Sequence, residues 1–308
     1  MDENKILRAL ESLNLQIEEA ISSSEAIAGR RVKGAVNALR HFDLSYLIRA
    51  IKLMMPSNRP TQNPNANNLD YAQWLASLVH GDKTKKTVVY TCITGGYDTP
   101  QAPLYYPDNV EYVMLISDND LISAPGWSTR AIPDAIIRKF DNTMANRYIK
   151  FHPHDLFKDE FDVAVYVDGN LQPVSDLSYY ASCIKNNVGI SAHRHSRRSC
   201  AYDEIKVCRL MRKGNASKLQ SYKEVLEEFG FPREYGLIEC NVLATDLNSN
   251  LARKIYDEWW NELLNSGCMR DQVILPYILW KNDILIDDVA TMGNNVWRDT
   301  KLRSFKHN

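Results

Sequence analysis

The sequence predicts an α/β fold: a mostly parallel sheet with helices on both faces, preceded by an α-helical N-terminal region. From residue 87 on, short apolar runs rich in β-branched residues alternate with longer helical patterns. Strands that alternate with helices usually form a parallel sheet covered on both faces. The first 86 residues show helical periodicity without such runs.

The candidate strands are 87–93, 110–116, 161–167, 188–192 and 236–244. The candidate helices in the same part of the chain are 131–150, 175–186, 201–212, 216–229, 247–265 and 270–281. Ligands of such sheets bind at the carboxyl ends of the strands, so the residues that follow each run are the first candidates for a site.

The length of 308 residues predicts about two structural units, or one large α/β unit with an appendage. We expect a helical N-terminal region over 1–86, with a linker rich in Pro and Asn near 56–68, and an α/β domain over 87–308. With 37 basic and 38 acidic residues the net charge is −1, which excludes a globally basic nucleic-acid-binding protein. We therefore expect no nucleic-acid partner.

The N-terminus carries no apolar leader, and the chain has no run of about 18 apolar residues. The six cysteines are scattered without a C-x-x-C pair, which favours buried, reduced thiols. Both observations predict a soluble protein in a reducing cytoplasm.

The N-terminal region leaves two pairs of interpretations open. An apolar stripe from Ile6 to Ile21 predicts a long helix that either packs on the main domain or pairs between subunits of a homo-oligomer. Residues 29–59 combine basic and apolar side chains. Such a segment is either a surface helix docked by its apolar side or a peripheral contact with the inner membrane face.

The first two strands are followed by candidate ligand-binding residues. Thr94, Gly95 and Gly96 follow the first strand, and glycines allow close backbone approach to a phosphate or a base; an ordinary turn is the alternative. Asp118 follows the second strand and could accept hydrogen bonds from a ribose or a base, with an Asx-turn as the alternative. The chain contains neither a G-x-G-x-x-G nor a P-loop motif.

The third strand carries the most informative motif. Asp168 stands at its carboxyl end, followed by Gly169 and Asn170. A carboxylate and a second oxygen ligand at this spacing can hold Mg²⁺ or Mn²⁺ against a nucleotide diphosphate. A phosphatase of the haloacid-dehalogenase type is disfavoured, because its nucleophilic aspartate would fall on Tyr166.

Two later segments add polar candidates. His193 and His195 share a face if the segment is extended, but no third zinc ligand stands at the required spacing. A phosphate-facing pocket with Arg197 is favoured over a zinc site, and a solvated loop is the alternative. Asp271 begins an apolar helix, where it caps the helix or faces an acceptor hydroxyl. The tryptophan pair 259–260 is expected in the core.

Taken together, the motifs resemble the glycosyltransferase-like domain family shared by plant mucilage and turgor proteins and by bacterial polysaccharide loci. The resemblance runs in order from about residue 87 to 280. Its motifs are VVYTCITGGYD, RYIKFHPHDLF, VYVDGN, the run from His195 to Glu204, GLIECNV, and WW-x-E followed by RDQ-x-x-L-x-Y. Two departures are Ser196 in place of the family's proline and Asn170 in place of its second acid.

The resemblance implies a GT-A-like fold, Mn²⁺ or Mg²⁺, a nucleotide-sugar donor, and a saccharide or lipid-linked acceptor. Asp168 and Asn170 would face metal and diphosphate. The phosphate and sugar side would be lined by Arg147, Lys150, His195 and Arg197, and the donor sugar or acceptor by Arg270, Asp271 and Gln272. If the reaction inverts configuration, Asp271 is the first candidate base and Glu204 the second; a retaining reaction needs neither.

The sequence therefore predicts a glycosyltransferase that acts in cell-surface polysaccharide synthesis. The alternative is a nucleotide-sugar-binding protein without transfer activity, which recruits a partner through its N-terminal helices.

Overall fold

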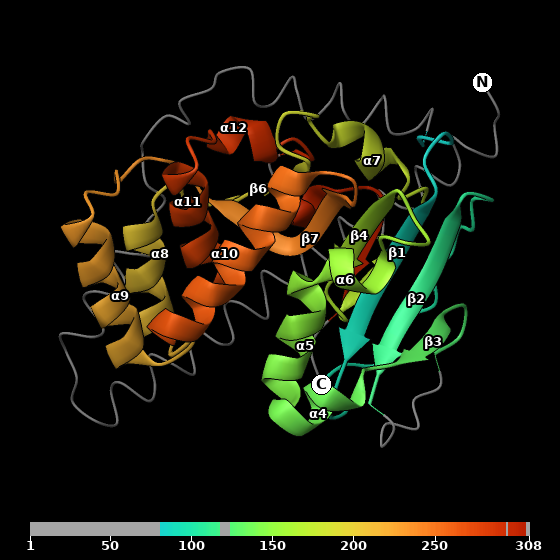
Figure 1. Ribbon diagram of the computed structural model, residues 1–308, viewed down its shortest axis with the longest axis horizontal. Coiled ribbons are helices and arrows are strands. Elements are labelled where there is room, and N and C mark those ends of the chain that lie inside the picture. The colour runs from blue at the N-terminus through green and yellow to red at the C-terminus, as the bar shows by residue number, and fades with distance from the viewer. Residues whose placement is uncertain (1–80, 118–123, 294, 306–308) are drawn as a thin grey trace.

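The computed structural model describes residues 81–117, 124–293 and 295–305 (Figure 1). The predicted N-terminal helices, the linker near 56–68 and Asp118 lie outside the described residues. The division of the chain at residue 86 therefore stays a prediction.

The described residues contain a six-stranded sheet in the order β3-β2-β1-β4-β7-β6. Strands β1, β2, β3 and β4 pair in parallel, whereas β7 is antiparallel to both β4 and β6. The predicted mostly parallel sheet is confirmed. The strands are β1 Thr87–Ile93, β2 Val110–Ile116, β3 Ser128–Ala131, β4 Val163–Val167, β6 Ile190–Arg194 and β7 Ile238–Asp246.

Both faces of the sheet are covered, as predicted. All seven residues of β1 are buried, because alternate side chains enter two separate apolar clusters. Tyr90 points into the larger cluster with side chains of α5, α8, α9, α10 and α11, and Val89 points into a smaller cluster with α7. The tryptophan pair 259–260 lies in the larger cluster, which confirms its predicted core position. Figure 1 shows α5 and α10 to the left of β1 and β2.

The helices are α4 Asp134–Lys139, α5 Asn142–Phe151, α6 Pro153–Phe157, α7 Tyr179–Cys183, α8 Ala201–Leu210, α9 Ala216–Glu228, α10 Asn250–Ser266, α11 Asp271–Lys281 and α12 Ile286–Val289. The single helix predicted over 131–150 is two helices. Phe140 is extended and ends α4, and the Asp141 side chain then accepts a hydrogen bond from the Met144 amide and caps α5. This second start orients α5 independently of α4.

A two-stranded sheet lies beside the main one and was not predicted. β5 (Leu171–Pro173) follows Asn170 directly and pairs antiparallel with β8 (Leu302–Ser304). The segment before β8 is held by Asp299, whose Oδ2 accepts hydrogen bonds from Tyr180 at 2.8 Å and lies 2.7 Å from His193 Nε2. The C-terminal strand is thereby fixed against the residues that follow β4.

Two further observations concern the cysteines and the lengths of the helices. All six cysteines are free, and five of them are buried, as the sequence predicted. Within the described ranges, every helix is too short or too polar to cross a bilayer.

We expect Asp299→Asn to destabilise the fold by about 1.5–3 kcal/mol at pH 7, because it removes a buried charge-assisted hydrogen-bond acceptor. Burial raises the pKa of Asp299, but Lys301 and His193 outweigh burial and hold the pKa well below its ordinary value. A depressed folded pKa adds stability above the unfolded pKa of about 4, and this stability is lost as the pH falls through the folded pKa. Urea unfolding of both proteins should therefore show a difference that shrinks below about pH 4.

The matched control is Asp134→Asn, which breaks an exposed pair with Arg138 and should change stability by less than about 1 kcal/mol. If the difference in the free energy of unfolding between wild type and Asp299→Asn stayed constant down to pH 2, Asp299 would not stabilise the fold through its ionised form.

Candidate functional site

Polar residues of four strands lie at one end of the main sheet, where the parallel strands have their carboxyl ends. β1, β4 and β6 end there, and β7 starts there because it runs the opposite way. Asp168 follows β4, Thr94 follows β1, His195 follows β6, and Asn241 lies near the start of β7. The carboxyl-end position predicted for the site is the place where these residues gather.

Lys150, near the end of α5, is the centre of the arrangement. Its side chain is buried, and its Nζ lies 2.5 Å from Asp271 Oδ2 at the start of α11 and 4.0 Å from Asp168 Oδ1. The same ammonium group lies 5.0 Å from the centre of the Tyr166 ring, which supports it from the sheet side. One buried ammonium group thus lies next to two carboxylates, one after β4 and one at the start of α11.

The two carboxylates have opposite pKa shifts. Burial raises the pKa of Asp168, and the charge of Asp271 raises it further, although Lys150 opposes both effects. Burial acts in the same sense on Asp271, but Lys150, Arg147 and Arg270 outweigh it and hold the pKa of Asp271 well below its ordinary value. Asp271 is therefore the firmly ionised member of the pair.

Two arginines flank this centre. Arg147 donates from Nη2 to the Met269 carbonyl at 2.7 Å, and its buried Nε has no hydrogen-bond partner among the described residues. Arg270 donates to Gln272 Oε1 at 3.1 Å. Three cations thus surround Asp271, in a part of the molecule that could receive a phosphate group.

A second group of predicted residues is built around His195. The ring Nδ1 accepts from the main-chain amides of Arg197 and Arg198, so the proton of the neutral ring is on Nε2. Nε2 lies 3.8 Å from Glu204 and 3.7 Å from Glu239, while burial lowers the pKa of His195. His195 therefore stabilises the loop after β6.

Glu204 and Arg197 have different surroundings. Glu204 is buried in α8, where it accepts from Arg198 Nε and from the Cys208 thiol at 3.3 Å. Arg197 is exposed. The predicted roles of Glu204 as a second base and of Arg197 as a phosphate ligand stay predictions.

The expectation that His193 and His195 share a face is wrong. His193, within β6, bonds Asp299 and packs against Tyr180, whereas His195 lies between Glu204 and Glu239. The strand ends at Arg194, and a bulge between Ala192 and His193 already breaks its regular alternation.

The turn after β1 is built for close backbone approach. Gly95 and Gly96 both have positive φ, at 62° and 64°, which glycine adopts without strain. A side chain at Gly95 would meet Asn142, whereas the space above Gly96 is open. Thr94 donates its hydroxyl to the Asn142 carbonyl at 2.8 Å, which ties this turn to the start of α5.

The turn after β4 lies against the turn after β1. A Cβ atom at Gly169 would come within 2.9 Å of Ile93 and 3.0 Å of the Asp98 carboxylate, so glycine permits this approach. Asn170 donates from Nδ2 to the Phe305 carbonyl at 2.9 Å. Its buried Oδ1 has no hydrogen-bond partner within the described part of the chain.

Asp168 and Asn170 carry oxygen groups of the kind that divalent cations prefer. Mg²⁺ and Mn²⁺ prefer oxygen ligands, and Mg²⁺ commonly takes one or two carboxylates from the protein and the remainder from substrate phosphates and water. Asp168 and the unpaired Asn170 Oδ1 offer such a partial set. Among the described residues, no group of three or more His, Cys, Asp or Glu side chains is arranged to hold a metal ion.

Two site residues on β7 were missed by sequence reasoning. Asn241 donates to Asp168 Oδ2 at 2.8 Å, and Glu239 accepts from Gln272 at 2.7 Å. The available signal was the presence of two polar residues, two positions apart, in an otherwise apolar run. Their spacing places them on one face of the strand.

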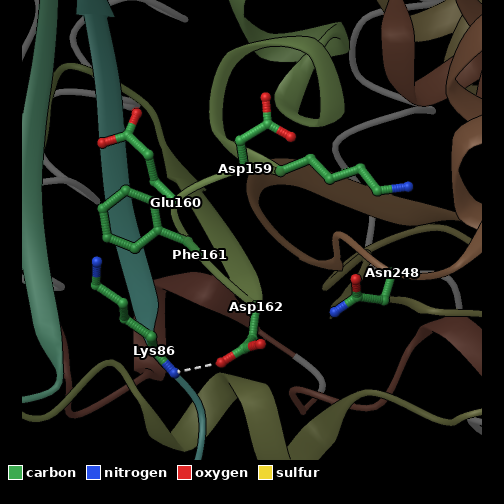
Figure 2. Close-up of a pocket in the computed structure, with 7 residues that line it drawn as sticks. Lys86, Asp159, Glu160, Phe161, Asp162 and Asn248 are labelled. Atoms are coloured by element: carbon green, nitrogen blue, oxygen red, sulfur yellow. Dashed lines mark hydrogen bonds between the residues drawn. The ribbon is translucent and has the colours of Figure 1, made fainter.

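A cavity of about 240 Å³ lies at the other end of the sheet, where β1 and β4 begin (Figure 2). Lys86 and Asp162, which precede β1 and β4, line it together with Asn248, which follows β7. None of the predicted site residues lies there.

Comparison with known proteins gives a likeness in structure alone. No protein-family model and no curated protein sequence matches the chain. Mouse xyloside xylosyltransferase 1 in its apo form aligns with 65% of this chain and 83% of its own, at 10% identity and a TM-score of 0.39. The bifunctional glycosyltransferase WbbM aligns with 65% of this chain and 38% of its own, at 14% identity and a TM-score of 0.38. The glycosyltransferase GlyE of Streptococcus pneumoniae aligns with 64% of this chain and 43% of its own, at 13% identity and a TM-score of 0.35.

We expect Lys150→Met to destabilise the fold by about 3–5 kcal/mol, because it leaves Asp168 and Asp271 without their buried cation. The double variant Lys150→Met/Asp271→Leu should lose less, since it removes the paired charge as well. Both free energies of unfolding are measured by urea denaturation at pH 7.

Lys206→Met provides the surface comparison, since Lys206 pairs with Asp203 in an exposed position and its loss should cost less than about 1 kcal/mol. Equal losses for Lys150→Met and Lys206→Met would show that the buried pair does not hold the site together.

Proposed function

We propose that the protein is a GT-A-like glycosyltransferase, which moves a sugar from a nucleotide-sugar donor to a saccharide or lipid-linked acceptor in cell-surface polysaccharide synthesis. The observation that carries the proposal is the gathering of Asp168, Lys150 and Asp271 at the carboxyl edge of the sheet, flanked by Arg147 and Arg270. The ordered resemblance of the sequence motifs to the glycosyltransferase-like domain family supports the same reaction.

Glycosyl transfer requires that the negative charge of the departing nucleotide diphosphate be stabilised. A site that contains three cations around one ionised carboxylate has that capacity, because the arginine side chains present planar donor groups to phosphate oxygens. Arg147 retains an unused buried donor at Nε. In this proposal the diphosphate lies against Arg147 and Arg270, with Lys150 beneath them.

The turn formed by Thr94, Gly95 and Gly96 is proposed to receive the nucleoside part of the donor. The space above Gly96 is open, so its main chain is accessible. Gly95 and Gly96 have positive φ and no side chains that could block the approach of a ligand. This turn lies next to Gly169, which connects it with the proposed diphosphate position.

Mn²⁺ or Mg²⁺ is the proposed cofactor, held by Asp168 and Asn170 Oδ1. The cation would supply further charge stabilisation for the leaving diphosphate. The protein's own contribution is to orient the two oxygens: Asn241 bonds the Asp168 carboxylate, and Phe305 bonds the Asn170 amide.

Asp271 is the proposed carboxylate near the acceptor. Its depressed pKa makes it a weak base, since it stays ionised in the ion pair with Lys150 at 2.5 Å. Its charge is therefore better suited to orienting an acceptor hydroxyl or to stabilising positive charge that develops on the sugar. Glu204 remains the second candidate.

The same ion pairs favour an alternative, a nucleotide-sugar-binding protein without turnover. Asp271 is engaged by Lys150, and Glu204 by Arg198. In that case a nucleotide sugar would raise the melting temperature by binding the folded state, while no acceptor would yield a product. The cytoplasmic location stays a prediction. So does the peripheral contact with the inner membrane face through residues 29–59, which lie outside the described residues.

Incubation with UDP-, GDP- and dTDP-sugars plus Mn²⁺ tests the proposal through the release of nucleotide. We expect release with one nucleotide class, and a loss of at least about a hundredfold in Asp168→Ala, because the leaving diphosphate loses a group that stabilises its charge. Asp159→Ala, which changes an exposed aspartate at the opposite edge, should keep the wild-type rate.

Release that is equal in Asp168→Ala and wild type would contradict the assigned role of Asp168. Stabilisation by a nucleotide sugar without release, over a panel of saccharide and lipid-linked acceptors, would favour the binding protein.

A further inference from the structure

The Asp168 carboxylate is oriented by a residue of another strand. β4 and β7 pair antiparallel up to Val167 and Val242, and the next two residues, Asp168 and Asn241, continue this pairing. The Asp168 amide donates to the Asn241 carbonyl at 2.9 Å, and the Asn241 side chain donates from Nδ2 to Asp168 Oδ2 at 2.8 Å. The main chain and the side chain of Asn241 thus hold both ends of Asp168.

The second carboxylate oxygen of Asp168, Oδ1, lies near Lys150 without bonding to it. Oδ1 lies 4.0 Å from Lys150 Nζ, which is beyond hydrogen-bond distance, because that ammonium bonds Asp271 at 2.5 Å. The Asp168 side chain is 28% exposed, so this carboxylate is open to a ligand while Lys150 itself is buried. The terminal torsion of an aspartate is broad, and rotation about it would turn the carboxylate toward the nearby ammonium group.

From this geometry we infer that Asn241 is a positioning residue that keeps Asp168 turned toward the ligand and away from Lys150. The inference deepens the proposed function, on which it rests, and concerns the binding of a nucleoside diphosphate with a divalent cation. Tyr166 also hydrogen-bonds the Asp168 side chain, but the Asn241 amide is the donor to Oδ2. Without the Asn241 amide, the carboxylate would turn and close the 4.0 Å gap to Lys150. The ammonium would then neutralise the charge that the cation requires, and affinity for the diphosphate complex would fall.

The positioning role of the Asn241 side chain can be tested separately from its role in folding, because a main-chain hydrogen bond also links residue 241 to Asp168. Asp168 donates to the carbonyl of residue 241, so substitution of the side chain leaves this link in place. Asn241→Ala and Asn241→Leu both remove the donor, and Asn241→Leu nearly keeps the side-chain volume. Asn248→Ala is the matched control, because Asn248 lies beyond the other end of β7 and lines the cavity at the opposite edge.

The test is calorimetric titration of UDP, GDP and dTDP in the presence of Mn²⁺. For the diphosphate that binds wild type best, Asn241→Ala and Asn241→Leu should each weaken binding about tenfold or more, since a hydrogen bond to a charged group is lost. Asn248→Ala should bind as wild type does. Circular dichroism checks that each variant is folded before titration.

A double-mutant cycle separates positioning from a structural effect. If Asn241 acts through Asp168, then Asp168→Ala/Asn241→Ala should bind no more weakly than Asp168→Ala alone. Fully additive losses would overturn the inference, as would wild-type affinity in both Asn241 variants or failure of both variants to fold.

The same titrations distinguish failure of this inference from failure of the proposed function. Wild-type protein that binds none of the three diphosphates, or an Asp168→Ala variant that binds like wild type, removes the proposed site and the role of Asn241 together. Strong binding that depends on Asp168 and not on Asn241 removes the role of Asn241 alone.

Discussion

The structure at the candidate site depends on one buried ammonium group. Lys150 brings α5, β4 and α11 together, because its charge is tolerable in the interior only next to Asp168 and Asp271. The pair at 2.5 Å fixes the start of α11 against α5, and the weaker contact at 4.0 Å leaves Asp168 accessible. The unequal sharing of one cation gives the two carboxylates different chemical characters, with Asp271 firmly ionised and Asp168 more easily protonated.

Much of the main sheet could be predicted because its central strands are buried on both faces. The strands predicted at 87–93 and 110–116 have the observed bounds of β1 and β2, since continuous apolar runs leave little doubt about a fully covered strand. The edge strand β3 was missed because its four residues are mostly exposed and lack such a run. β5 and β8 have three residues each, and about 130 residues of sequence separate them. A local sequence pattern cannot predict the pairing of two such distant segments.

The position of Asp168 followed from the sequence, because it depends only on the end of a strand. The partners of that residue did not. Lys150 is a long basic side chain in an amphipathic helix, a type that is nearly always exposed, and its burial results from tertiary pairing with Asp271. The role of Asn241 requires the knowledge that β7 runs antiparallel beside β4, which alternation of polar and apolar residues does not reveal. The fates of His193 and His195 likewise depended on where β6 ends.

The pairing of β8 with β5 has a practical consequence for handling the protein. Phe305 donates its amide to the Asn170 carbonyl and accepts from the Asn170 side chain, so Phe305 is held at the turn that follows Asp168. An affinity tag or fluorescent fusion inserted shortly after Phe305 would begin only a few residues from that turn. Attachment at another exposed position would keep such an appendage away from Asp168 and Asn170.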